Sequence, residues 1–147
     1  QLVDGGRLRR RSVALVACVG QKAATARPAA ELYTSAWFRK AAAYAEKVAD
    51  AWYILSAKYG LVDPEDVISP YDETLNRMPA DERRAWAKRV VYDLCDVLLP
   101  GDKVVMLAGV RYREYLVEPI RKFGCEVVIP LAGLRIGEQL RWLNQHR

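Results

Sequence analysis

Residues 12–19 read SVALVACV, a short apolar run rich in valine that is followed by Gly20. A run of this length and β-branched character is typical of a strand buried on both faces of a parallel sheet. Similar apolar runs follow along the chain: AWYILSA at 51–57, KVVMLA at 103–108 and CEVVIPL at 125–131. The sequence therefore predicts four buried strands.

Segments with helical spacing of apolar residues separate these runs. The expected helices cover residues 34–48, 81–99 and 111–123, and a last helix, whose start is flanked by Gly133 and Gly137, runs through Leu140 and Leu143. Thr34 or Ser35 can cap the first helix and Asp81 the second, and Pro119 should kink the third or delay its start. Strands that alternate with helices predict an α/β fold: a single domain with a short, mainly parallel four-stranded sheet flanked by helices on both faces.

Two segments stand outside this alternation. Residues 61–80 contain three prolines and five acidic residues, and we expect them to be irregular. A connection of that length in a compact domain is often functional. Residues 1–11 contain four arginines and are predicted to form a basic, flexible arm, with a solvated tail or the remainder of a longer chain as the alternative. The α/β domain is assigned to residues 12–147.

The composition of the chain limits the classes of protein to which it can belong. The 147 residues have a formal net charge of +5, which is compatible with an anionic partner such as nucleic acid or a nucleotide. No apolar run is long enough to span a membrane. Three widely spaced cysteines and one histidine fit neither a disulfide framework nor a zinc site. We therefore expect a cytoplasmic protein with no membrane association and no cofactor or metal, and the oligomeric state stays open.

Each expected strand is followed by a segment that contains a glycine and a basic residue. Because the carboxyl ends of parallel strands meet at one edge of a sheet, these segments should converge there. Glycine allows close approach of a ligand, and a helix start offers free N–H groups to an anion. The candidate residues in these segments are Cys18, Lys22, Ser56, Lys58, Tyr59, Gly60, Arg111, Gly133, Arg135 and Gly137. The alternative is that the glycines only end strands and the basic side chains are solvated.

The irregular segment and Cys18 contain further candidate site residues, and each has both a functional and a purely structural interpretation. Tyr71 could stack on a base, and Asp72 could act as a general base or stabilise a developing cation. Alternatively, the loop is solvated and Asp72 caps a short helix. Cys18 could be a nucleophile if Lys22 or a helix start stabilised its thiolate, or else a small core residue. No histidine lies near it in the sequence.

The segments LSAKYGLVDP at 55–64 and ISPYDETL at 68–75 resemble the central motif of YaaA-like proteins, which have a serine, a Tyr-Gly-Leu and then a Pro-Tyr. A small bacterial and phage branch of unknown function is also similar at Cys18 with Lys22, at AELY (30–33) and at GLRIGEQL (133–140), so the resemblance spans roughly residues 12–145. It implies DNA binding and, through a fold similar to uracil-DNA glycosylases and a domain of archaeosine synthase, work on an N-glycosidic bond. The chain departs from the glycosylase pattern because its cleft lacks a histidine.

Two main function hypotheses follow. In the first, the chain is an enzyme acting on a nucleic-acid base or nucleotide, a glycosylase-like hydrolase. Its catalytic residues would be Ser56, Lys58 and Asp72. The substrate-binding residues would be Cys18, Lys22, Tyr59, Gly60, Tyr71, Arg111, Gly133, Arg135 and Gly137. In the second, it is a non-catalytic DNA-binding module linked to stress or phage defence, in which the arm arginines hold phosphates. A nucleotide or metabolite sensor is a third possibility.

Overall fold

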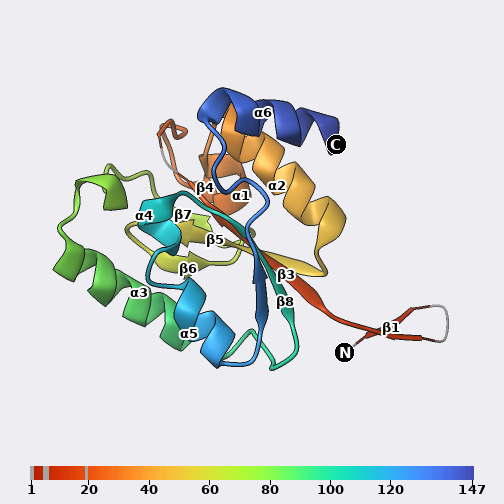
Figure 1. Cartoon of the computed structure of the whole chain (residues 1–147). Helices are drawn as coiled ribbons and strands as arrows, with labels where there is room; N and C mark the ends of the chain where they lie inside the picture. The colour runs from red at the N-terminus through yellow and green to blue at the C-terminus, as the bar shows by residue number, and fades with distance from the viewer. Residues whose placement is uncertain (1, 5–6, 19) are drawn as a thin grey trace.

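The central feature of the computed structural model, which describes residues 2–4, 7–18 and 20–147, is a five-stranded sheet (Figure 1). Its strands are β3 (Ser12–Ala17), β5 (Ala51–Ser56), β6 (Gly60–Val62), β8 (Lys103–Leu107) and β9 (Glu126–Val128), in the order β6-β5-β3-β8-β9. All are parallel except β6, which is antiparallel to β5. The predicted α/β fold class is therefore confirmed, while Val19, the expected end of the first strand, lies outside the described residues.

Helices cover both faces of the sheet, as predicted (Figure 1). One face packs against α1 (Ala29–Leu32), α2 (Ala36–Val48) and α6 (Ile136–Gln145). The other packs against α3 (Ala80–Leu94), α4 (Val110–Arg113) and α5 (Val117–Lys122). Along β3, Val13 and Leu15 contribute to one hydrophobic cluster and Ala14 and Val16 to the other, because successive side chains of a strand point to opposite faces.

The segment expected to be irregular contains short regular elements. β6 is the fifth strand of the main sheet, β7 (Val67–Ile68) pairs with β4 (Arg27–Pro28), and a 3-10 helix, η1, covers Leu75–Arg77. The expectation of an irregular connection is confirmed for residues 69–74, which form no helix or strand, but it missed β6 and β7, because strands of two or three residues are too short to show an alternating pattern. Gly60 has a φ of +74°, a backbone conformation that favours glycine, and so allows the chain to reverse directly after β5.

The ends of the helices correct several sequence-based expectations. Ser35 caps α2 as expected, and its Oγ accepts a hydrogen bond from the N–H of Phe38 at 3.2 Å. The second helix begins after Pro79 and ends at Leu94, earlier than predicted, and Asp81 lies in its first turn instead of capping it. A carboxylate is favourable there because it faces the positive end of the helix dipole.

The helix expected over 111–123 is divided into α4 and α5. Pro119 lies in the first turn of α5, where its missing N–H would have no intrahelical partner. The helical segment thus begins at Val110, without delay, and is broken into two helices rather than kinked or late in starting. Gly124 follows α5 with a φ of +106°, as expected of a glycine that ends a helix.

The basic arm contains a short antiparallel ladder between β1 (Leu2–Asp4) and β2 (Arg7–Arg9), which the sequence did not predict. Figure 1 shows it extending beyond the main sheet. Residues 1, 5 and 6 of the arm lie outside the described residues. Two ion pairs anchor its base: Arg10 pairs with the exposed Glu126, and Arg11 with the buried Asp102, each at 2.6 Å.

These two ion pairs should contribute very differently to stability. Asp102 is 3% exposed and also accepts a hydrogen bond from the N–H of Leu99 at 2.8 Å, so it cannot be rehydrated when its partner is lost. We predict that Arg11→Met lowers the free energy of unfolding by about 3 kcal/mol, measured by urea denaturation. Arg10→Met, the matched control, should cost less than about 1 kcal/mol. Equal losses for the two variants would contradict this assignment.

Candidate functional site

The order of the strands reverses beside β3. After β3 the chain forms β5 on one side of it and then returns to form β8 on the other side. In open α/β sheets, such a reversal leaves a crevice at the carboxyl ends of the strands, where ligands bind. In this protein that position lies between the end of β3 and Gly109, which follows β8.

A cavity of about 270 Å³ occupies that position. It is lined by Ala17 at the end of β3, Ser35 and Trp37 at the start of α2, Gly109, and Ile136 and Gln139 of α6. The indole N–H of Trp37 donates to Oε1 of Gln139 at 2.8 Å, and Nε2 of Gln139 donates to the carbonyl of Leu134 at 2.9 Å. These bonds fix both side chains and join α2 to α6 across the cavity, which we call the crossover pocket.

At the carboxyl end of β5, three hydroxyl groups form a hydrogen-bonded cluster. Ser56 Oγ donates to the Tyr71 hydroxyl at 2.8 Å and accepts from the N–H of Tyr59 at 3.0 Å. The hydroxyls of Tyr71 and Tyr33 are 2.7 Å apart. Ser56 is completely buried, and its proton is already engaged. In this arrangement Ser56 positions the loop that contains Tyr71; its proposed catalytic role stays a prediction.

Cys18 lies in the same hydrogen-bonded group. Its Sγ donates to the carbonyl of Leu55 at 3.4 Å, and the residue is 2% exposed. Burial raises the pKa of Cys18 to about 12, although hydrogen bonds to Tyr33 and Tyr71 and the charge of Lys22 act in the opposite direction. At neutral pH the thiol is therefore protonated, which favours the interpretation of Cys18 as a small buried residue rather than a nucleophile. Burial also raises the pKa of both tyrosines.

Lys22 and Tyr59 complete the surroundings of Tyr71. The Lys22 ammonium lies 4.4 Å from the centre of the Tyr71 ring and donates to the carbonyl of Gly20 at 3.1 Å. The ring of Tyr59 stands almost perpendicular to that of Tyr71, with 5.6 Å between their centres. Lys22 thus covers part of Tyr71, so the more exposed Tyr59 offers the better stacking surface for a base.

The remaining predicted site residues occupy different surroundings. Asp72 is fully exposed and lies 4.0 Å from Arg77, in no contact with the hydroxyl cluster. Gly60 is buried, and a Cβ added there would lie 3.8 Å from Val90 of α3, so this glycine faces the core. The exposed residues are Lys58 after β5, Arg111 in α4, and Gly133, Arg135 and Gly137 around the start of α6.

The structure thus brings five of the predicted residues together: Cys18, Lys22, Ser56, Tyr59 and Tyr71. It adds Tyr33, Trp37 and Gln139, which the sequence analysis did not select. Trp37 has the spacing of a core position on its helix. Tyr33 is the last residue of the motif AELY, and Gln139 lies within the motif GLRIGEQL. Their partners are distant in sequence, so only the fold reveals them.

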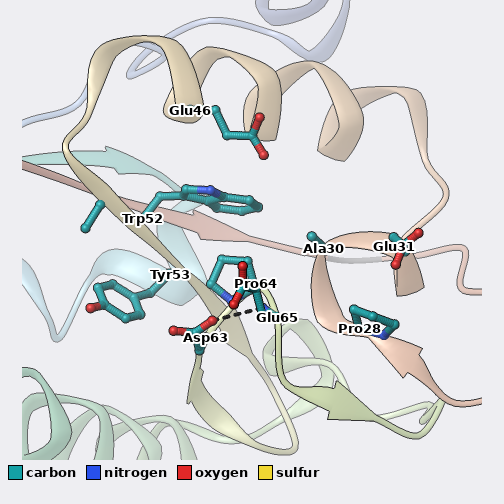
Figure 2. Close-up of a pocket in the computed structure, with 10 residues that line it drawn as sticks. Pro28, Ala30, Glu31, Glu46, Trp52, Tyr53, Asp63, Pro64 and Glu65 are labelled. Carbon is teal, nitrogen blue, oxygen red and sulfur yellow. Dashed lines mark hydrogen bonds between the residues drawn. The ribbon is translucent and has the colours of Figure 1, made fainter.

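A second, larger pocket lies at the other end of β5 (Figure 2). Its volume is about 610 Å³, and Ala51, Trp52 and Tyr53 of β5 form part of its wall. Four carboxylates surround it, from Glu31, Glu46, Asp63 and Glu65. No predicted site residue lines either pocket. The four carboxylates would repel an anionic ligand from the acidic pocket, whereas the crossover pocket lies at the carboxyl ends of the strands, so the crossover pocket remains the candidate site.

Within the described ranges, no cluster of histidine, cysteine or acidic side chains is suited to hold a metal ion. Likewise, none of the described helices combines the length and apolar character that a membrane-spanning segment needs.

Comparison with known proteins gives two matches. Residues 13–145 match the model of a family described as "Family of unknown function (DUF6884)". The chain is also 33% identical over 125 residues to the uncharacterized protein YfjM of Bacillus subtilis (strain 168), covering 80% of this chain and 78% of that protein. Neither description mentions YaaA, so the resemblance to YaaA-like proteins stays a prediction.

The environment of Cys18 predicts how its thiol reacts. In the native protein at neutral pH, a thiol reagent such as iodoacetamide should modify the exposed Cys95 and leave Cys18 unmodified, because Cys18 is both buried and protonated. Peptide mass spectrometry identifies the modified residue, and labelling in denaturant is the control in which both should react. Modification of native Cys18 at the rate of Cys95 would show an activated nucleophile instead.

Proposed function

The chain belongs to DUF6884, a family of unknown function, and we propose that it binds a nucleotide unit, free or within nucleic acid, at the carboxyl edge of its sheet. The observation that supports this most is the crossover pocket, which lies where α/β sheets bind ligands. Its volume of about 270 Å³ suits a small planar group such as a base. The positive net charge of the chain favours an anionic ligand over a cationic one.

The walls of the pocket offer both apolar and polar recognition. The indole of Trp37 provides an aromatic surface, and the side chain of Gln139 is held in one orientation by two hydrogen bonds. The helices α2 and α6 both begin at the pocket, at Ser35 and Arg135. Ser35 Oγ accepts from the Phe38 N–H at the first start, and the Glu138 carboxylate accepts from the Arg135 N–H at the second. Only the remaining first N–H groups of these helices could interact with a phosphate nearby.

Three basic side chains surround this edge and support binding of phosphate. Arg135 directly precedes Ile136, which lines the pocket, and Arg111 belongs to α4, two residues after the lining residue Gly109. Lys22 follows the end of β3 and approaches Tyr71. Arg111 is 4.0 Å from Glu114, but that carboxylate is also bound by Arg83 at 2.7 Å and so neutralises Arg111 only in part.

The activity we propose on this nucleotide is processing of its base, including cleavage of the N-glycosidic bond, as the resemblance to YaaA-like proteins and glycosylase folds implies. Asp72 would then supply the carboxylate that orients water or stabilises an oxocarbenium-like ribose. Non-catalytic binding is the second candidate. It is favoured by the separation of Asp72 from the hydroxyl cluster and by the burial of Ser56.

Filling the crossover pocket tests the binding proposal. Gly109 lines the pocket, has an ordinary φ of −67°, and has nothing within 4 Å of an added Cβ, so Gly109→Phe should fold and occupy the space of the ligand. We expect it to weaken binding of a fluorescent deoxynucleotide at least tenfold, or about 1.4 kcal/mol, in anisotropy titrations. The control Ala85→Phe, on an exposed position of α3, should bind as the unchanged protein does.

A base-release assay distinguishes base processing from non-catalytic binding. Mass spectrometry should detect free base released from single-stranded DNA with modified bases, and Asp72→Asn should abolish release without weakening binding. Asp96→Asn, another exposed acidic residue, is the control. Binding without release from any substrate would establish the non-catalytic candidate, and unchanged binding by Gly109→Phe would overturn the pocket assignment.

A further inference from the structure

Three strand-end segments share a surface pattern: each exposes a large apolar side chain next to a basic one. The pairs are Lys58 with Tyr59, Arg111 with Val110, and Arg135 with Ile136. Tyr59 is 37% exposed, Val110 58% and Ile136 62%. We call these six residues the rim. Exposed apolar side chains scattered singly need no explanation, but three that each adjoin a cation at one edge of the sheet form a pattern.

The rim extends on both sides of the crossover pocket. Ile136 lines the pocket and Val110 follows Gly109, which also lines it. Tyr59 follows β5, which is separated from β8 by β3. Because neighbouring strands are about 4.8 Å apart, the segments after β5 and β8 lie roughly 10 Å from each other. A ligand that touches the whole rim must therefore span at least this distance.

Tyr59 is held as a stacking surface. Its N–H is bonded to the buried Ser56, its ring packs at 5.6 Å from Tyr71, and its hydroxyl donates to the carbonyl of Ser69 at 3.4 Å. The Lys58 ammonium lies 5.3 Å from the ring centre. An exposed tyrosine fixed in this way loses little conformational entropy when a base stacks on it.

The charge of the rim is only partly neutralised. Glu114 contacts Arg111 at 4.0 Å, and Glu138 accepts from the backbone N–H of Arg135 at 2.9 Å. In the part of the chain that the structure describes, neither Lys58 nor the Arg135 guanidinium lies within ion-pair distance of a carboxylate. Two cations thus remain available to phosphates on either side of the pocket.

We infer that the rim binds a single-stranded nucleic acid several nucleotides long, with one base in the crossover pocket and a neighbouring base on Tyr59; the inference rests on the proposed function. Single strands present both uncovered base faces and regularly spaced phosphates, which match alternating apolar and basic side chains. In a duplex the base faces are stacked and inaccessible. The rim therefore favours single strands over duplexes.

The test uses the full chain and fluorescein-labelled thymidylates: the mononucleotide, the trinucleotide, the hexanucleotide and a duplex containing the hexanucleotide. We expect the hexanucleotide to bind at least tenfold more tightly than the mononucleotide and more tightly than the duplex. Tyr59→Ala should lower the affinity for the hexanucleotide about tenfold, since base stacking on an aromatic side chain is lost. Tyr92→Ala removes a tyrosine that is 76% exposed on α3 and is the matched control.

The basic side chains have a separate readout. The double variant Lys58→Gln, Arg135→Gln should reduce the slope of log affinity against log salt by about 1.4 for the hexanucleotide, because two phosphate contacts are lost. Lys88→Gln, Arg89→Gln on α3 removes the same charge elsewhere and should leave the slope unchanged.

The outcomes separate this inference from the proposed function. Equal affinity for mononucleotide and hexanucleotide, with no effect of Tyr59→Ala, would overturn the inference and leave nucleotide binding in place. Tighter binding of the duplex, or binding only to vesicles of anionic phospholipid, would also overturn it. If the protein binds neither the mononucleotide nor any oligonucleotide, the inference and the proposed function both fail.

Discussion

The parallel pairing of β3 with strands on both of its edges is the constraint on which the rest of the structure depends. Residues 13–18 are buried on both faces, so β3 can lie only in the interior of the sheet. With β5 on one side and β8 on the other, the connecting segments leave β3 in opposite directions. The crossover pocket between Ala17 and Gly109 is the space that this divergence leaves.

The hydroxyl cluster then determines which side chains surround that edge. Tyr71 comes from the long segment after β6, and its hydrogen bonds to Ser56 and Tyr33 fasten this segment to the end of β5 and to α1. Leaving a buried hydroxyl without a partner costs about 1–3 kcal/mol, so the three groups stabilise one arrangement over others. In the described part of the chain, no buried side-chain polar atom lacks a partner. Lys22 and Tyr59 both pack against Tyr71 as a result.

The sequence predicts the sheet well because its signals are local. The apolar run at 12–19 predicts β3 nearly to the residue, and the hydroxyl of Ser35 predicts the start of α2. The sequence does not predict β6 and β7, because these strands have only two or three residues and their pairing partners cannot be identified from hydrophobic patterns. The site shows the same division: motif residues such as Ser56 and Tyr71 were found, whereas the contact of Trp37 with Gln139 joins residues 102 positions apart.

The central claim is that a nucleotide unit binds in the crossover pocket, and the indole N–H signals of the four tryptophans test it most directly. Trp37 lines this pocket, whereas Trp52 lines the acidic pocket at the other end of β5. The account predicts that adding thymidylate to the ¹⁵N-labelled protein shifts the indole signal of Trp37 and leaves that of Trp52 in place. A shift at Trp52 with none at Trp37, or no shift at saturating thymidylate, would contradict it.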